Sequence, residues 1–294
     1  MDIKPLLRQF NLRPKKSLGQ NFLVDEHALS NIVQAAEIAS DDVVLEIGPG
    51  LGSLTRHLAD VARHVVAVEI DRTLIPPLRL AVADRSNVSI VAGDILQLDP
   101  TESLSHYLTS EPHSRRYKVV ANIPYYITSA IIRHLLETEV KPQAIVLTIQ
   151  SEVAQRIIAQ PDDMNLLAVS VQFYGTPRIV QRIPAGAFYP APDVDSAVVR
   201  IDLPDQPRVV VKDADMFFKV AKAGFGQKRK QLHNSLVAGL PLKHAQIRQA
   251  LTEVGIDPKR RAETLTLEEW GRLSDLLIGD WGSGIRDQDV LPAE

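Results

Sequence analysis

Short apolar runs and amphipathic segments alternate along residues 1–204. The runs are rich in Val, Ile and Leu, which is typical of strands buried on both faces of a parallel sheet. Strands are expected at residues 43–47, 65–68, 88–91, 118–121, 144–149, 166–174 and 196–201. Between the runs, apolar residues recur at helical spacing, as in Leu29, Ile32 and Ala36 behind the capping residue Asp25. This alternation predicts an α/β fold with a doubly wound, mostly parallel sheet.

The pattern changes after the proline-bounded segment 204–207. Helical spacing then predicts helices over residues 213–223, 228–239, 243–254 and 266–278. The last helix begins with the capping box Thr266-Leu267-Glu268-Glu269. We therefore expect an N-terminal domain over residues 1–204 and a small C-terminal α-helical domain over residues 205–294.

Composition narrows the class of protein. The chain has 294 residues, a net charge of −3 and no cysteine, which excludes disulfides and thiolate metal sites. The eight histidines show no ligand-like spacing, and no stretch reaches the roughly eighteen apolar residues of a membrane span, so a cytoplasmic, metal-free protein is expected. Basic residues gather in an N-terminal arm, residues 1–16, and in clusters at 228–230 and 259–261. These are candidate contacts for phosphate, although such clusters are also common on solvated faces.

Glycines and acids follow the first three expected strands. Residues 48–52 read G-x-G-x-G, and Ser53 stands where the dinucleotide pattern would need a further glycine, which disfavours a pyrophosphate cofactor. Glu69 ends the next strand, where an acid can accept from both hydroxyls of a ribose. Asp94 follows the third strand, where it can accept from an adenine amine. Together they predict a site for a nucleoside-bearing cofactor.

The turn Asn122-Ile123-Pro124-Tyr125-Tyr126 follows the fourth strand. Proline stiffens this turn and holds backbone carbonyls at a fixed angle. Asn122 adds a side-chain acceptor, and Tyr125 and Tyr126 add flat faces on which a base can stack. An acceptor beside an aromatic platform suits an exocyclic amine on a planar ring, although such a turn also occurs as mere packing.

With these motifs in order, the chain resembles the bacterial small-subunit (16S) ribosomal RNA adenine N6,N6-dimethyltransferases. The segments that match are Lys16 to Leu23, Leu45 to Gly52, Glu69, Gly93-Asp94, Asn122 to Tyr126, Phe188 to Ala197 and Arg261 to Glu263. The resemblance implies a Rossmann-like methyltransferase sheet with S-adenosylmethionine as cofactor. By position, Asn21 and Leu23 would close over the cofactor and Gly48 would approach its methionine part. Glu69 would hold the ribose, Asp94 the adenine amine, and Asn122 would lie between cofactor and substrate.

The resemblance also implies the reaction: two methyl transfers to the exocyclic N6 amine of each of two adjacent adenines. The partner would be small-subunit ribosomal RNA or an immature small ribosomal subunit, linking the protein to ribosome biogenesis. The protein would act as a monomer, without membrane or metal, and its C-terminal domain would bind RNA. Asn122 and the carbonyl of Ile123 or Pro124 would accept the amine hydrogens. Tyr125 and Phe188 would sandwich the extruded base.

Two departures and two alternatives accompany this interpretation. The family often has Lys where this chain has Asp193, and a Gly- and Lys-bearing loop where it has residues 161–165, so both changes place acid near the expected RNA entrance. The first alternative is a large-subunit rRNA adenine methyltransferase of the antibiotic-resistance kind, which residues 225–234 and 261–263 disfavour. The second is a non-catalytic ribosome-assembly factor, which the intact Asn122 and Tyr125 disfavour.

Overall fold

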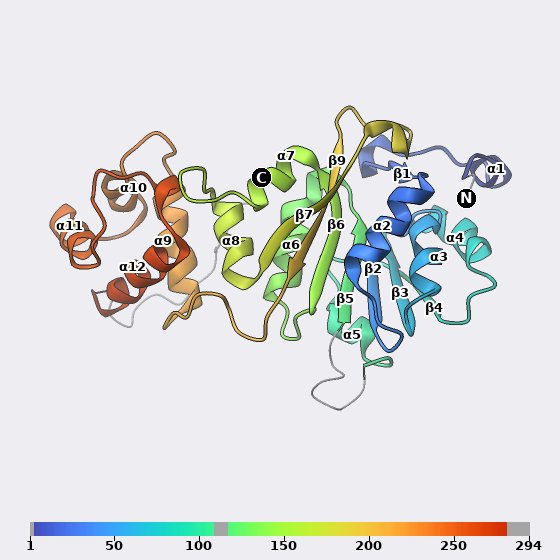
Figure 1. Ribbon diagram of the computed structural model, residues 1–294, viewed down its shortest axis with the longest axis horizontal. Helices are drawn as coiled ribbons and strands as arrows, with labels where there is room; N and C mark the ends of the chain where they lie inside the picture. The colour runs from blue at the N-terminus through green and yellow to red at the C-terminus, as the bar shows by residue number, and fades with distance from the viewer. Residues whose placement is uncertain (1–2, 109–116, 281–294) are drawn as a thin grey trace. The chain divides into compact units, whose positions relative to one another are not determined.

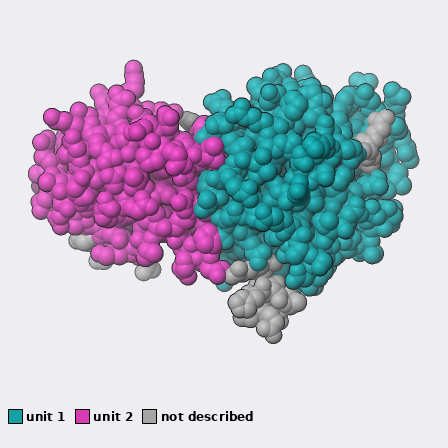
Figure 2. Space-filling model, in the orientation of Figure 1, with its two compact units in different colours: residues 1–155, 176–203 teal, residues 156–175, 204–294 magenta. Residues whose placement is uncertain are grey.

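The computed structural model describes residues 3–108 and 117–280. The chain divides into two compact units, coloured separately in Figure 2. The first comprises residues 1–155 and 176–203, and the second comprises residues 156–175 and 204–294. The helical part expected from residue 205 onwards therefore accounts for most of the second unit. That unit also takes residues 156–175 from inside the expected first domain.

The first unit is built on a seven-stranded sheet in the order β4-β3-β2-β5-β6-β9-β7 (Figure 1). Its strands are β2 (Val43–Ile47), β3 (His64–Glu69), β4 (Val88–Ala92), β5 (Tyr117–Asn122), β6 (Ala144–Gln150), β7 (Thr176–Ile183) and β9 (Ser196–Asp202). The strands β4, β3, β2, β5 and β6 pair in parallel, whereas β9 runs antiparallel to both of its neighbours. A separate two-stranded sheet pairs β1 (Phe22–Leu23) with β8 (Phe188–Tyr189).

Helices cover both faces of the sheet. Every residue of β2 is buried, and because successive side chains point to opposite faces, both faces must be covered. The helices of this unit are α1 (Ile3–Gln9), α2 (Glu26–Ala36), α3 (Ser53–Ala59), α4 (Ile75–Ala81), α5 (Pro100–Leu104), α6 (Thr128–Glu137) and α7 (Ser151–Ile157), the last of which continues into the second unit. Helices α2 and α3 pack in one apolar cluster with Val44, Val65 and Val120 of the sheet. The predicted doubly wound fold is thus confirmed.

One predicted strand is wrong. Residues 166–174 form the helix α8 (Leu166–Tyr174), not a strand. A continuous apolar run fits a buried helix as well as a buried strand, and here Asn165 decides, because its side chain accepts a hydrogen bond from the amide of Ala168 and caps a helix. The strand of this region is β7, which begins two residues after α8 and alternates exposed with less exposed side chains, as an edge strand does.

The second unit is helical. Besides α8 it contains α9 (Ala214–Phe225), α10 (Leu232–Gly239), α11 (His244–Glu253) and α12 (Leu267–Asp280), close to the four predicted helices. Their apolar faces share one cluster, in which Phe173 of α8 contacts Phe217 and Phe218 of α9. The 161–165 loop is fixed in this unit, because the amides of Asp162 and Met164 both donate to the carbonyl of Glu263.

The predicted basic arm at the N-terminus is folded. Its residues 3–9 form α1, and Ile3 and Leu7 are buried in a cluster with Phe22, Leu51 and Leu74. Packing of α1 therefore accounts for part of the segment expected to bind phosphate. Within the described ranges 3–108 and 117–280, no helix is long and apolar enough to cross a membrane.

Candidate active site

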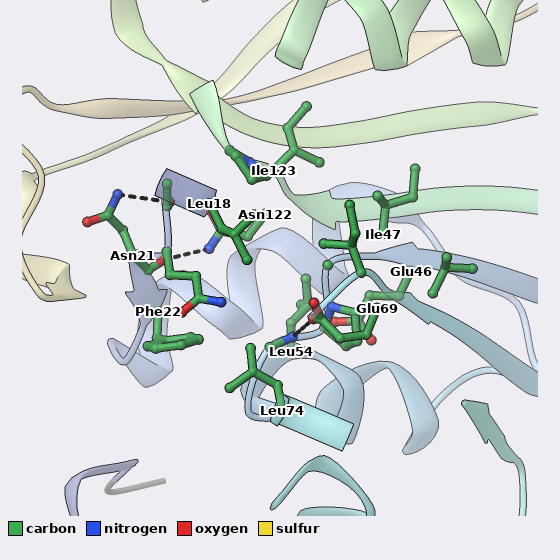
Figure 3. A pocket seen from close by; sticks show the side chains of 18 of the residues that line it. Leu18, Asn21, Phe22, Glu46, Ile47, Leu54, Glu69, Leu74, Asn122 and Ile123 are labelled. Atoms are coloured by element: carbon green, nitrogen blue, oxygen red, sulfur yellow. Dashed lines mark hydrogen bonds between the residues drawn. The ribbon is translucent and has the colours of Figure 1, made fainter. Parts of the chain in front are cut away.

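The carboxyl ends of four parallel strands meet at one edge of the sheet. Ile47 at the end of β2 is level with Val68 of β3 and Ala121 of β5, and Glu69 is level with Ala92 of β4. Strand order reverses between β2 and β5, and ligands of open α/β sheets bind at such a point. A pocket of about 1050 Å³, open solvent at its mouth included, lies there (Figure 3). Its wall includes residues 18–23, 46–51, 93–95 and 122–127.

The glycine turn between β2 and α3 lines this pocket with residues 48–51. Gly48, Gly50 and Gly52 all have positive φ, between 59° and 84°, a conformation that other residues rarely adopt. A Cβ on Gly50 would also lie 3.0 Å from the ring of Phe22. The turn therefore brings bare backbone to the pocket, as expected from its spacing.

Glu69 lies beside this turn. Its Oε2 accepts from the amide of Gly50 at 3.0 Å, and its Oε1 accepts from the amide of Asp71 at 2.7 Å. Burial raises the pKa of the carboxyl, against the lowering effect of these hydrogen bonds. Each carboxylate oxygen has a second lone pair, so Glu69 can accept two further hydroxyl hydrogens from inside the pocket.

Asp94, which is also predicted to bind the cofactor, lines the same pocket. Its Oδ1 accepts from the amide of Leu96 at 3.0 Å, and its backbone carbonyl accepts from the amide of Gln97 at 3.0 Å. The loop after β4 is thus held by its second residue, and the side chain is fixed at the pocket wall.

Glu46 is a site residue that sequence reasoning missed. It lies in β2, lines the pocket and is only 1% exposed. Its Oε2 and the Oγ of Ser53, which also lines the pocket, have no hydrogen-bond partner among the described residues. Unpaired buried polar atoms are costly, and because these two lie in the pocket wall, a polar group bound in the pocket can supply their partners. The ammonium and carboxylate of a methionine moiety match this acceptor and donor, and the pocket therefore fits S-adenosylmethionine. A carboxylate within an otherwise apolar strand was the available signal.

The buried Glu46 predicts a pH-dependent stability. Burial raises the pKa of its carboxyl from 4.5 to about 8, and the nearby Glu69 adds to the rise. Between these pH values the folded state holds a proton that the unfolded state releases, so stability falls as pH rises, by at most about 1.4 kcal/mol per pH unit. Glu46→Gln removes this loss, and its stability relative to the parent protein should increase from pH 5 to pH 8.

Urea unfolding without cofactor at pH 5, 6.5 and 8 measures this difference. The exposed Glu139→Gln is a matched control and should track the parent protein at every pH. A Glu46→Gln difference that stays constant across the three pH values would contradict the buried, protonated carboxyl.

Asn122 and Asn21 meet on the other side of the pocket. Asn122 ends β5, and its Nδ2 donates to the backbone carbonyl of Asn21 at 3.1 Å (Figure 3). Since a carbonyl can only accept, this contact fixes which end of the amide is which. The Oδ1 of Asn122 is therefore the end available to a substrate donor. Leu23, two residues after Asn21, is buried and also lines the pocket.

The aromatic residues are placed differently from one another. Tyr125 lines the pocket, and its hydroxyl bonds the Oγ of Ser196 at 2.7 Å. Tyr126 lines the pocket too and is 61% exposed. Phe188 is 4% exposed, pairs with Leu23 across β1 and β8, and is not among the described residues that line the pocket. The two rings expected to sandwich a base, Tyr125 and Phe188, therefore do not both face the pocket in this structure.

The sheet order and the pocket at its switch point define a Rossmann-like methyltransferase. Over residues 11–278 the chain matches the family described as Ribosomal RNA adenine dimethylase. The chain therefore belongs to the ribosomal RNA adenine dimethylase family, and it is an S-adenosylmethionine-dependent methyltransferase. The resemblance that the motifs indicated is confirmed.

Individual relatives agree with this assignment. "Ribosomal RNA small subunit methyltransferase A" of Dehalococcoides mccartyi is 45% identical over 92% of this chain and 90% of its own, and that of Moorella thermoacetica is 45% identical over 92% and 95%. Among solved structures, the 23S rRNA methyltransferase ErmE is 29% identical with a TM-score of 0.68, covering 88% of this chain and all of its own. A Plasmodium falciparum dimethyladenosine transferase, 24% identical with a TM-score of 0.71 over 86% and 95%, shares the fold.

Proposed function

We propose that this protein dimethylates the exocyclic N6 amine of two adjacent adenines in small-subunit ribosomal RNA during ribosome biogenesis. Curated relatives named for the small subunit reach 45% identity, whereas the large-subunit enzyme among the solved structures is 29% identical, which supports the small-subunit substrate. Glu69, Asp94, Asn122 and Tyr125 all line the pocket, which disfavours a non-catalytic assembly factor. The protein would act as a monomer without metal.

The orientation of Asn122 carries this proposal. Its Nδ2 is engaged by the carbonyl of Asn21, so its Oδ1 can accept a hydrogen from the target amine. With the backbone carbonyl of Ile123 or Pro124 as a second acceptor, both amine hydrogens are held and the nitrogen lone pair points at the donor methyl group. The same acceptors stabilise the positive charge that develops on the nitrogen.

The base must leave its stack to reach these acceptors. Tyr125 offers one stacking face, and its bond to Ser196 fixes the ring. Phe188 supplies the second face in this proposal, which requires its ring to become exposed when RNA binds. Pro124 and Tyr126 contribute to the mouth of the pocket through which the base enters.

On the cofactor side, Glu69 binds the ribose hydroxyls and Asp94 accepts from the adenine amine. Gly48 lets the backbone approach the methionine part, while Glu46 and Ser53 pair with its charged groups. Asn21 and Leu23 close over the cofactor. When bound, S-adenosylmethionine supplies a methyl group activated by its sulfonium, so these residues contribute alignment above all.

The basic cluster Lys228-Arg229-Lys230 is the phosphate contact that we propose for the second unit. All three side chains are exposed between α9 and α10, and none forms an ion pair with another described residue. By contrast, Arg260 binds Glu269, with Nη2 to Oε2 at 3.0 Å, and Arg261 pairs with Glu263.

Neutralising the three residues 228–230 should flatten the dependence of RNA affinity on salt by about one unit of slope per lost contact. Binding titrations at several salt concentrations measure this slope. Arg85→Gln is the control, because Arg85 pairs with Asp60 and lies before the amino end of β4, whereas the pocket lies at the carboxyl end of that strand. An unchanged slope would make residues 228–230 ordinary solvated side chains.

The proposed substrate is tested with labelled S-adenosylmethionine and separated ribosomal subunits, followed by mapping of the methylated nucleotides. Two dimethylated adenines in small-subunit RNA are expected. Label in large-subunit RNA alone would favour the antibiotic-resistance kind of enzyme, and no label in any particle or naked RNA would favour a non-catalytic factor.

A further inference from the structure

Residues 15–23, here called the flap, form part of the wall of the pocket described above. Residues 18–23 line the pocket, and they carry Asn21 and Leu23. On one side, the flap touches the turn after β5: Asn122 binds the carbonyl of Asn21, and a Cβ on Gly19 would lie 3.1 Å from the Cβ of Pro124. The flap is therefore packed tightly against the proposed methyl-acceptor side.

On its other side, the flap is tied to a single carboxylate. Nζ of Lys15 lies 2.8 Å from Oδ1 of Asp71, and Nε2 of Gln20 donates to Oδ2 of Asp71 at 2.8 Å. Gln20 also closes the flap on itself, because its Oε1 accepts from the amide of Lys15 at 2.9 Å. Both oxygens of Asp71 thus hold residues more than fifty positions away in the chain.

Asp71 is well placed for this role. It is 5% exposed and caps the short helix η2 (Arg72–Leu74), accepting from the amide of Thr73. Burial alone would raise the pKa of its carboxyl, but hydrogen bonds from Lys15, Thr73 and Gln20 outweigh burial and lower the pKa to about 2. Its own amide donates to Oε1 of Glu69. Asp71 therefore contacts both the flap and Glu69, the residue proposed to bind the ribose.

We propose that Asp71 is a positioning residue for the methyl donor: by holding Lys15 and Gln20 it keeps the flap over the bound cofactor. A flap that is already held loses less conformational freedom when the cofactor binds, so the hold increases affinity without a contact between Asp71 and the cofactor. This inference rests on the proposed function in one respect only: the cofactor must bind in the pocket that the flap lines.

The test exchanges the side-chain amide of Gln20 and the carboxylate of Asp71 between the two positions. Asp71→Asn keeps an oxygen for the amide of Thr73, and hence the cap of η2, but sets a second amide donor against Gln20. Gln20→Glu sets two carboxylates against each other. The double variant Gln20→Glu/Asp71→Asn again pairs one amide with one carboxylate. Asp60→Asn, which breaks the ion pair to Arg85 in the same unit, is the matched control.

Two readouts besides activity apply: the dissociation rate of S-adenosylhomocysteine, and hydrogen exchange of the flap amides without cofactor. We expect each single variant to release the ligand about tenfold faster and to exchange its flap amides faster. The double variant restores the contact with residue 20 but not the charge that binds Lys15, so it should recover part of both. Asp60→Asn should stay within twofold of the parent protein. In turnover, KM for the cofactor should rise while kcat at saturation changes little.

A purely structural role for Asp71 predicts no recovery in the double variant, and that result would overturn the proposal. Single variants that release the ligand at the parent rate would overturn it too. The cofactor site itself is judged separately by Glu69→Ala. If that change weakens binding but the Asp71 series does not, only the flap proposal fails.

Discussion

Tyr125→Ala is expected to lower single-turnover methylation roughly 10- to 100-fold while the protein stays folded. The change removes a stacking face, which contributes about 1–3 kcal/mol per base. It also leaves the buried hydroxyl of Ser196 without its partner, which costs about 1–3 kcal/mol of stability. Rates at saturating cofactor and RNA, with a melting curve for each protein, are the measurement.

Two variants separate the contributions at this turn. Tyr125→Phe keeps the ring and loses only the hydrogen bond to Ser196, so it should retain most of the rate. Asn122→Ala removes an acceptor of the target amine and should lower the rate by about 10²- to 10³-fold, with weaker cofactor binding if Asn122 also contacts the cofactor. A folded Tyr125→Ala protein that methylates adenine at the parent rate would exclude the base-stacking role.

Glu69→Ala should weaken the binding of S-adenosylmethionine by roughly 10- to 100-fold and leave RNA affinity nearly unchanged. The change removes a charged acceptor from ribose hydroxyls, at a cost of about 1.5–3 kcal/mol. It also frees the amides of Gly50 and Asp71, which Glu69 holds in the structure. Titration calorimetry with cofactor and with RNA gives both affinities on the isolated protein.

Glu69→Gln is the informative companion to this variant. It keeps one carbonyl oxygen for a backbone amide but presents an NH₂ group at the other position, so cofactor affinity should fall less than in Glu69→Ala. If both variants bind the cofactor as the parent protein does, the ribose lies elsewhere and the assignment of this strand end is wrong.

Much of the fold followed from patterns that are local in sequence. Runs such as residues 43–47 and 118–121 are strands because their length and β-branched content fit few other elements. Residues 166–174 were wrongly predicted because an apolar run of that length has no period to distinguish a buried helix from a buried strand. In that segment, the N-cap residue Asn165 is the feature that indicates a helix.

The candidate site likewise has a part that the sequence predicts and a part that it does not. Gly48, Glu69, Asp94 and Asn122 stand at strand ends, and the rule that parallel strands end at one edge was enough to bring them together. Contacts between distant segments were not predictable in this way. The hold of Asp71 on Lys15 and Gln20 depends on where a loop folds back, and the burial of Phe188 depends on the pairing of β1 with β8.

The second unit is discontinuous in sequence, and this limits what deletion experiments can show. Helix α8 precedes β7 in the chain, yet its Val169 and Phe173 pack with Phe217 and Phe218 of α9. A polypeptide shortened after Leu203 would keep α8 but lose the helices that its apolar face packs against. It would therefore expose a hydrophobic surface that is prone to aggregation. Loss of methylation in such a truncated protein would therefore report aggregation as readily as a missing RNA contact. Point substitutions in the full-length chain are therefore the better test of whether the helical unit contacts RNA.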